Sequence, residues 1–429
     1  MTTQLDDALR GLVSPVMKQS AEAEHVPCEK VRDEVALGHA VIPYNPIHAP
    51  SRPAVVGRAF GTKVNANLGR STVRSGIDEE MDKLSVALCA GADFVMDLSV
   101  GEELEAVRTE MLSRCCVPLG TVPIYEALSR ASGDISGLTP ELLLSVIADQ
   151  AEQGVDFMTL HAGLLAAHVP LTKKRVMGIV SRGGAALAEW MKNNDTENPL
   201  YTRWAEVLEI CHAHDVTVSL GDGLRPGCLA DAGDAAQFAE LDVLGELVQS
   251  CRAAGVQVMV EGPGHVPFNE IQMNMEREHT TCDGAPFYVL GPVVTDIAPG
   301  YDHITSCIGA TAAACYGASL LCYVTPAEHL GLPTSEEVRQ GVIASRIAAH
   351  AGDVARGLPG ARTRDDAISE ARMRFDWEKQ FELAIDGDYA RARYEKTRDA
   401  SAGEDDHCSM CGREFCAVRT SRRIHDRTD

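Results

Sequence analysis

Short apolar runs rich in β-branched residues alternate with longer amphipathic segments between about residues 60 and 350. Nine of the short runs have the length and composition of buried strands. They are Lys63–Asn67, Phe94–Leu98, Val117–Thr121, Phe157–Leu160, Gly178–Val180, Val216–Leu220, Val256–Val260, Phe287–Leu290 and Leu321–Val324. Six longer segments have helical spacing, and they are Ile77–Ala90, Glu102–Leu112, Pro140–Gln153, Trp204–His214, Asp234–Ala253 and Ser335–His350. This alternation predicts a parallel sheet with crossover helices.

Two α/β architectures fit the alternation, a closed (β/α)8 barrel of the TIM type and an open doubly wound sheet. Nine candidate strands exceed the eight of a barrel, so we expect one of them to be a loop or an extra ribbon. Polar or glycine-rich clusters follow nearly every candidate strand, and they begin at Asn65, Met96, His161, Ser181, Asp222, Glu261 and Glu328. A barrel collects such residues from all its strands on one rim, whereas an open sheet concentrates them at one switch point. The pattern therefore favours the barrel.

Four segments are predicted along the chain. Residues 1–55 form a helical N-terminal extension that ends in a proline-rich crossing, and residues 56–365 form the (β/α)8 barrel, on whose rim the polar clusters are expected. Residues 366–400 continue as helices, predicted at Ala367–Ala384 and Tyr389–Thr397. Residues 401–429 form a tail, which opens with the polar linker Ser401–Asp406 and carries three closely spaced cysteines.

Composition narrows the class of protein. The 429 residues are 45% hydrophobic and 24% charged, which is typical of a globular chain with a large core. The formal net charge of −23 argues against nucleic acid and against anionic membrane surfaces as partners. We expect no membrane span and no secretion signal, so most of the 14 cysteines are predicted to be buried free thiols in a reducing cytoplasm.

The tail contains the strongest metal-binding signal. Cys408, Cys411 and Cys416 lie within nine positions. Three thiolates that leave one position open are typical of an iron–sulfur cluster in which one iron stays free to bind another molecule. A structural zinc site normally has four ligands, and His407 could supply the fourth. From spacing alone, an iron–sulfur cluster is favoured over zinc, and an inert tail is the third interpretation.

Further candidate residues follow the strands. His265 and His329 each neighbour a carboxylate and could hold a divalent ion, although a lone histidine more often only bonds to the backbone. Ser181-Arg182-Gly183-Gly184 resembles a phosphate cradle at a helix start, or only a turn. The polar side chains that suit a nitrogen-rich or hydroxylated ligand are Asn67, Tyr125, His161, Asp222, Arg225, Glu261 and Tyr288, and Met96 by itself is interpreted as core.

Eight of these motifs together resemble one family. They are Lys63–Asn67, Val95–Ser99, Gly120–Tyr125, Ile179–Gly184, Gly221–Pro226, Glu261–His265, Thr295–His303 and Cys408–Cys411. They closely resemble the phosphomethylpyrimidine synthase (ThiC) family, in the short form that lacks the extra N-terminal domain of longer relatives. The resemblance runs from about residue 30 to 420.

This resemblance implies a noncanonical radical S-adenosylmethionine enzyme on a (β/α)8 barrel. Its expected reaction is a radical rearrangement of 5-aminoimidazole ribonucleotide to 4-amino-5-hydroxymethyl-2-methylpyrimidine phosphate in thiamine biosynthesis. The resemblance assigns Cys408, Cys411 and Cys416 to a [4Fe-4S] cluster, and His265 and His329 to a divalent metal, commonly zinc. It assigns to the substrate site Asn67, Met96, Tyr125, His161, Ser181, Arg182, Gly183, Asp222, Gly223, Leu224, Arg225, Glu261 and Tyr288. Glu261 or a histidine is the expected proton carrier.

Other readings remain open at this stage. A paralogous branch, the anaerobic 5-hydroxybenzimidazole synthases of cobamide biosynthesis, uses the same substrate and cluster motif. The chain departs from common family patterns at Tyr44–His48, Asp97–Val100 and Gly69–Thr72, which keeps that product possible. A zinc-dependent barrel hydrolase or lyase, and a non-enzymatic metal-binding module, are remoter alternatives. The resemblance also implies an external electron donor and a homodimer, in which the tail serves its own barrel or that of the partner.

Overall fold

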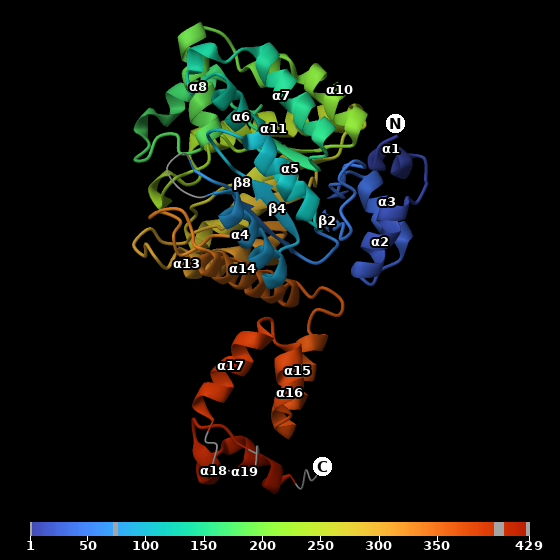
Figure 1. The fold of residues 1–429 in the computed structure, drawn as a ribbon, viewed down its shortest axis with the longest axis vertical. Coiled ribbons are helices and arrows are strands. Elements are labelled where there is room, and N and C mark those ends of the chain that lie inside the picture. The colour runs from blue at the N-terminus through green and yellow to red at the C-terminus, as the bar shows by residue number, and fades with distance from the viewer. Residues whose placement is uncertain (1, 72–75, 399–406, 426–429) are drawn as a thin grey trace. The chain divides into compact units, whose positions relative to one another are not determined.

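A closed barrel of eight parallel strands forms the core of residues 1–356. Figure 1 shows the helices that surround its strands. The structure is a computed structural model and describes residues 2–71, 76–398 and 407–425. The chain divides into two compact units, Met1–Arg356 and Gly357–Asp429. Within the described ranges, no helix is long and apolar enough to cross a membrane.

The barrel strands follow the chain order around the circle, and β10 closes the barrel by pairing with both β9 and β3. Their bounds are β3 Lys63–Leu68, β4 Phe94–Asp97, β5 Leu119–Thr121, β6 Phe157–Leu160, β7 Thr217–Leu220, β8 Val258–Gly262, β9 Phe287–Leu290 and β10 Leu320–Cys322. Almost every strand residue is buried, because side chains of one strand face fill the barrel and those of the other meet the helices. The prediction of a TIM-type barrel is confirmed, and the open sheet is wrong.

Helices connect the strands and cover the barrel. Their bounds are α4 Ile77–Ala90, α5 Leu104–Arg114, α6 Pro123–Arg130, α7 Pro140–Gln153, α8 Arg182–Asn194, α9 Pro199–Thr202, α10 Trp204–His214, α11 Ala235–Ala253, α12 Ile271–Thr281, α13 Asp302–Tyr316 and α14 Ser335–Ala355. Helix α7 illustrates why the sequence positions its ends so well. The Thr139 hydroxyl accepts the Leu142 N–H at 3.1 Å, Pro140 occupies the first turn, and Gly154 ends the helix with a φ of 106°.

One predicted strand is wrong. Gly178–Val180 lies in the loop before α8 and pairs with no strand in the described structure. Side chains bind the segment just before it: Asp231 accepts the N–H groups of Val176 and Met177 at 2.8 and 2.9 Å. The backbone there is satisfied by a carboxylate rather than by a neighbouring strand. Ser181 consequently follows a loop and caps α8, instead of following a barrel strand.

The N-terminal helices close the amino-terminal end of the barrel. Helices α1 Gln4–Leu9, α2 Pro15–Ala23 and α3 Cys28–Ala36, with the small antiparallel sheet β1 Ala40–Val41 and β2 Val56–Gly57, share a small core of their own. The Thr3 hydroxyl donates to the Gly255 carbonyl at 2.8 Å, and the Gln4 N–H donates to Asp215 at 2.9 Å. Both partners directly precede barrel strands. The opposite, carboxyl-terminal end of the barrel therefore remains for a site.

The second unit consists of helices α15 Thr363–Arg374, α16 Trp377–Leu383, α17 Gly387–Thr397, α18 Gly412–Phe415 and α19 Ala417–Ile424. The single helix predicted at Ala367–Ala384 is interrupted, because Phe375 has a φ of 59° and Asp376 starts α16 by accepting the Lys379 N–H. The small strands β1 and β2 were not predicted either, since two-residue strands give no periodic pattern. The predicted linker Ser401–Asp406 lies outside the described residues.

Candidate active site

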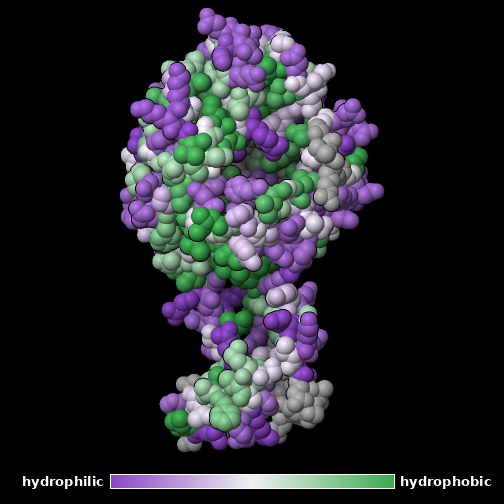
Figure 2. Space-filling view, turned by 90° about the vertical axis from the view of Figure 1, so that its left-hand side faces the viewer, coloured by the Kyte–Doolittle hydropathy of each residue, from purple (hydrophilic) through white to green (hydrophobic). Residues whose placement is uncertain are grey.

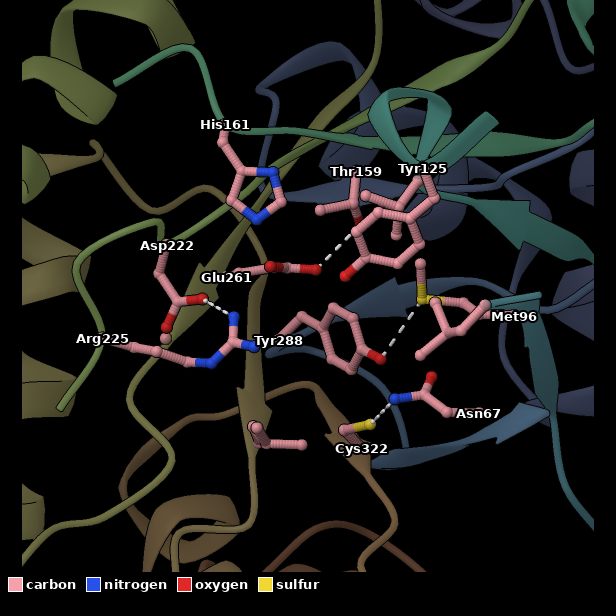
Figure 3. A pocket seen from close by; sticks show the side chains of 14 residues that line it. Asn67, Met96, Tyr125, Thr159, His161, Asp222, Arg225, Glu261, Tyr288 and Cys322 are labelled. Atoms are coloured by element: carbon pink, nitrogen blue, oxygen red, sulfur yellow. Dashed lines mark hydrogen bonds and ion pairs between the residues drawn. The ribbon is translucent and has the colours of Figure 1, made fainter. Parts of the chain in front are cut away.

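A pocket of about 440 Å³ opens at the carboxyl-terminal end of the barrel strands. Figure 2 shows the face onto which the loops after these strands open, with a hollow near its middle. The walls come from all eight strands or the segments that follow them. Figure 3 shows these side chains turned toward the same space. The lining residues are Asn67, Met96, Leu98, Val122, Tyr125, Thr159, His161, Asp222, Arg225, Glu261, Gly262, Tyr288, Leu290 and Cys322. Eight of the residues assigned to the substrate by resemblance line this pocket.

One wall of the pocket is a fixed network of neutral groups. The Asn65 side-chain N–H group donates to the Tyr288 hydroxyl and to Asn67, both at 2.7 Å. The Asn67 side-chain N–H group lies 3.0 Å from the Cys322 sulfur, and the Tyr288 hydroxyl lies 3.6 Å from the Met96 sulfur (Figure 3). Each group holds its neighbour, so this wall has a defined shape before any ligand enters.

Charged groups form the opposite wall. Arg225 binds Asp222 at 3.0 Å, and the Thr159 hydroxyl donates to Glu261 at 2.8 Å. Burial raises the pKa of both Asp222 and Glu261, and their mutual proximity raises that of Asp222 further, while the Arg225 guanidinium opposes both shifts. One guanidinium therefore faces two carboxyl groups that resist being charged together. Such a pair favours a state in which one of the two carboxyl groups keeps its proton.

His161 is neutral in this setting. It is buried, and desolvation together with the nearby Arg225 lowers its pKa to about 3. Its Nε2 lies 3.1 Å from the Ser181 hydroxyl, whereas its Nδ1 has no hydrogen-bonding partner among the described residues. A buried, unpaired ring nitrogen at the wall of a pocket is available to a ligand.

The Ser181 turn packs directly behind His161. The Ser181 hydroxyl accepts the Gly184 N–H at 3.1 Å and so caps α8. A side-chain carbon at Gly183 would lie 2.5 Å from the His161 ring, and one at Gly184 would lie 2.3 Å from the Gly223 carbonyl. Both glycines are thus required for the α8 start to approach the Asp222–Arg225 loop. Ser181, Gly183, Gly223 and Leu224 support the pocket wall rather than line it.

A second hollow of about 800 Å³ adjoins the pocket, since Asn67, Leu98 and Leu290 line both. Arg182 lines this neighbouring hollow rather than the first pocket, and its guanidinium lies 4.5 Å from the centre of the Tyr125 ring. Arg70 and Lys83 contribute two more positive side chains to the same hollow. The rim of the barrel therefore offers two connected spaces, one compact and one wide.

The two predicted metal-binding histidines come together. The rings of His265 and His329 have centroids 5.3 Å apart, although the residues follow different strands, β8 and β10. Their Nδ1 atoms bind Asp296 and Asp302, at 2.8 and 2.9 Å. Among the described residues no group of three or more histidine, cysteine, aspartate or glutamate side chains is arranged to hold a metal ion. The histidines thus offer a pair of ligands rather than a complete set.

The three tail cysteines flank one short helix. Cys411 and Cys416 bound α18, and the Gly412 N–H donates to the Cys408 carbonyl at 3.3 Å. All three are free thiols, with Cys411 exposed and Cys416 buried. The backbone therefore brings the three positions to one turn.

A model of the radical SAM ThiC family matches residues 3–423. This chain belongs to the radical SAM ThiC family. The predicted family is confirmed over almost the whole chain. Membership of this family implies a [4Fe-4S] cluster and S-adenosylmethionine as cofactors. The hydrolase and the non-enzymatic metal-binding module gain no support.

The ThiC relatives are similar over their length as well. A phosphomethylpyrimidine synthase from Halobacterium salinarum is 57% identical over 100% of this chain and 90% of its own length. One from Natronomonas pharaonis is 59% identical over the same shares. Among solved structures, a dihydropteroate synthase from Xanthomonas albilineans covers 74% of this chain and 100% of its own, at 14% identity and a TM-score of 0.44, a likeness too low to support any conclusion.

Sequence reasoning missed three residues of this ThiC site. Thr159 and Cys322 line the pocket, but they lie inside strand patterns and are predicted as core. Glu240 lies in α11 and accepts the Leu224 N–H at 2.7 Å, while its other oxygen has no partner among the described residues. The available signal for Glu240 was an acidic residue at helical spacing from apolar positions such as Ala236 and Leu244, because a carboxyl group on the buried face of a helix needs a local partner.

Proposed function

We propose that this chain is a phosphomethylpyrimidine synthase that rearranges 5-aminoimidazole ribonucleotide to 4-amino-5-hydroxymethyl-2-methylpyrimidine phosphate. The observation that supports this most is the pocket itself, a compact space bounded by one guanidinium, two carboxyl groups whose pKa burial raises, and a neutral imidazole. The relatives at 57–59% identity are phosphomethylpyrimidine synthases, and they match this chain over its whole length. Both observations point to a small, nitrogen-rich, phosphorylated substrate.

The phosphate end is proposed to lie against the Ser181–Gly184 and Asp222–Arg225 turns. The start of α8 has backbone N–H groups without helical partners, and the macrodipole favours an anion there. Gly183 and Gly223 add no side chain to this corner, and Arg225 supplies a fixed positive charge in an otherwise acidic protein. Arg182, which lines the second hollow, would add a further positive contact to the phosphate, as the Ser181–Gly184 motif predicts.

The aminoimidazole end is proposed to lie between the neutral wall and Glu261. Asn67, Met96, Tyr125 and Tyr288 would contact the ring, and Glu261 would accept a ring or amino N–H. Glu261 is also the proposed proton carrier, because burial raises its pKa and Thr159 holds its carboxyl in place. His161 would act as a hydrogen-bonding partner rather than an acid, since its ring is neutral.

The tail cysteines fit the family cluster. Three free thiols on one turn match the three protein ligands of a [4Fe-4S] cluster with one open iron, and Cys408, Cys411 and Cys416 would hold it. When bound, the cluster supplies the electron that generates a substrate-oxidising radical from S-adenosylmethionine. Because ligand side chains commonly settle into place as a metal binds, we infer that the final arrangement of the thiols forms with the cluster.

The histidine pair fits a divalent metal, for which we propose zinc. Imidazole nitrogens are common zinc ligands, and a catalytic ion keeps positions open for water or substrate. His265 and His329 would provide two ligands, with the remaining positions filled by small molecules. An external electron donor and a homodimer complete the proposal. The fourteen free thiols suit a reducing cytoplasm.

Anaerobic turnover tests the proposed reaction. The purified chain, with its cluster reconstituted, is mixed with 5-aminoimidazole ribonucleotide, S-adenosylmethionine and a chemical reductant, and the products are identified by mass spectrometry. The expected product is the pyrimidine phosphate, formed together with 5′-deoxyadenosine. Formation of 5-hydroxybenzimidazole would replace the proposed product while keeping the substrate, and cofactor cleavage without any change in the nucleotide would refute the substrate.

A further inference from the structure

Two aspartate–histidine pairs stand side by side at the rim of the barrel. His265 follows β8 and His329 follows β10, and β9 lies between these two strands in the barrel. The connection after β9 supplies both aspartates, Asp296 from its loop and Asp302 from the first position of α13. One loop therefore reaches to both sides and contacts one histidine on each, at 2.8 and 2.9 Å.

The aspartates fix which nitrogen faces outward. An ionised carboxylate can only accept hydrogen bonds, so each Nδ1 carries the proton and each Nε2 keeps its lone pair. The second oxygen of each carboxylate is also used. That of Asp296 accepts the Leu229 N–H at 2.9 Å, and that of Asp302 accepts the Gly300 N–H at 3.1 Å. Both carboxylates are thus anchored to the backbone, which suits a support better than a ligand.

The spacing of the rings agrees with one shared ion. Zinc binds imidazole nitrogen at about 2.0–2.1 Å, so two Nε2 ligands at a tetrahedral angle require ring centroids about 5 Å apart. The observed centroids are 5.3 Å apart, with the ring planes tilted by 55°. Two imidazoles held at this separation could both bind one ion.

We propose that Asp296 and Asp302 are positioning residues that orient His265 and His329 as a ligand pair for one divalent ion. The inference rests on the metal of the proposed function and adds to it the residues that prepare the site. Partners of this kind keep a ligand in the correct tautomer and raise its basicity, and their loss commonly weakens metal binding 10- to 100-fold. Asp302 is almost buried, at 5% side-chain exposure, whereas Asp296 is 37% exposed. The Asp302 pair should therefore contribute more.

Zinc titration of the full chain tests the assignment. The chain is purified anaerobically with its cluster, stripped of loosely bound metal, and titrated with Zn²⁺ against a chromophoric chelator. Asp302→Ala is expected to raise the zinc Kd about 10- to 100-fold, and Asp296→Ala less. Asp302→Asn, which keeps the shape and an acceptor oxygen, should recover part of the affinity. Circular dichroism and cluster absorbance should match the wild type in all variants.

Asp6→Ala is the matched control. Asp6 also binds a histidine, His212, at 3.0 Å, but that pair lies at the amino-terminal end of the barrel, away from the His265–His329 pair. The zinc affinity of the Asp6→Ala variant should equal that of the wild type. The inference is overturned if both Asp→Ala variants bind zinc as the wild type does while His265→Ala and His329→Ala lose it. If the histidine variants also retain full zinc affinity, the metal of the proposed function itself is wrong.

Discussion

The barrel pocket and the cysteine turn are prepared for their ligands in different ways. In the pocket, polar side chains from different strands bind one another before any ligand is present, as Asn65 binds Tyr288 at 2.7 Å across the barrel. In the tail, Cys411 is exposed, Cys416 is buried, and their positions follow from one four-residue helix, α18. The pocket is thus prepared by the fold, whereas the cysteine turn depends on what it binds. Substitutions should consequently act differently in the two regions.

The largest effect is expected in the tail. Changing Cys408, Cys411 or Cys416 to alanine should abolish the cluster signal in electron paramagnetic resonance, and 5′-deoxyadenosine formation with it, because a cluster with three protein ligands cannot spare one. Cys211→Ala and Cys251→Ala are the controls, since both thiols are fully buried in the barrel core. They should keep both signals. If Cys411→Ala keeps its full cluster content, the assignment of the cluster to this turn is wrong.

The next effect concerns the single guanidinium of the pocket. Arg225→Ala should leave Asp222 and Glu261 without their positive partner and should lower kcat/KM for the nucleotide at least about 100-fold, the scale on which a broken buried ion pair acts. The cluster signal should remain. Arg277→Ala serves as a control, because Arg277 is a surface residue that stacks on Phe238. Equal losses in the two variants would mean that the pocket has been assigned to the wrong residues.

Gly183→Ala should disturb the phosphate corner more moderately. The added carbon would lie 2.5 Å from the His161 ring, so the imidazole or the α8 start must shift. We expect KM for the nucleotide to rise about 10-fold, which corresponds to about 1.4 kcal/mol of binding free energy. The change in kcat should be smaller, because the altered contact is with the phosphate end of the substrate. Gly61→Ala, whose added carbon meets its nearest atom at 3.5 Å, should change neither parameter. A normal KM in Gly183→Ala would contradict the phosphate corner.

The smallest effects are expected at two buried acids, Glu240 and Asp215, whose pKa values are raised to a similar extent but which lie at opposite ends of the barrel. Burial raises the pKa of Glu240, behind the pocket, to about 8, and that of Asp215, at the closed end of the barrel, also to about 8. Each acid holds a proton when folded and loses it when unfolded, so each lowers stability as pH rises from about 4.5 to 8. Glu240→Gln and Asp215→Asn should therefore raise Tm relative to wild type, and increasingly so over that range.

Substrate affinity then distinguishes the two acids. Glu240 holds the Leu224 N–H of the Asp222–Arg225 loop, whereas Asp215 holds Gln4 of the N-terminal extension. Glu240→Ala should raise KM several-fold and Glu240→Gln should restore it, because the glutamine oxygen can still accept that N–H. Asp215→Ala should leave KM unchanged. An increase of KM in Asp215→Ala would show that general destabilisation, not loop support, controls affinity.

Local patterns predicted the barrel well, because its elements are specified locally. Helices α4, α7 and α10 have the predicted bounds. The Thr139 cap starts α7, and a glycine with positive φ ends both α4 and α7. Gly178–Val180 has the composition of a strand, yet Asp231, more than 50 residues away, binds the chain beside it. No local pattern contains that contact. The helix is interrupted at Phe375 because this residue has a left-handed backbone conformation, which the helical spacing of apolar residues does not predict.

The candidate site was predictable where motif and geometry coincide. The polar residues after the strands converge because a barrel places all its strand ends on one rim. The supporting residues were not predictable, since their roles depend on neighbours from other segments. Glu240 of α11 accepts the Leu224 N–H from a different segment of the chain. Asp296 and Asp302 belong to one motif, Thr295–His303, and its spacing does not indicate that each binds a different histidine.

The contact between Asn67 and Cys322 has a consequence for synthesis of the chain. These residues lie 255 positions apart and meet where the last strand closes the barrel against the first. The neutral wall of the pocket is therefore incomplete until β10 has been synthesised and has left the ribosome. A nascent chain without β10 cannot form the complete binding pocket. A nucleotide that binds only the closed barrel favours closure by mass action. Supply of the substrate during translation should thus increase the yield of folded protein.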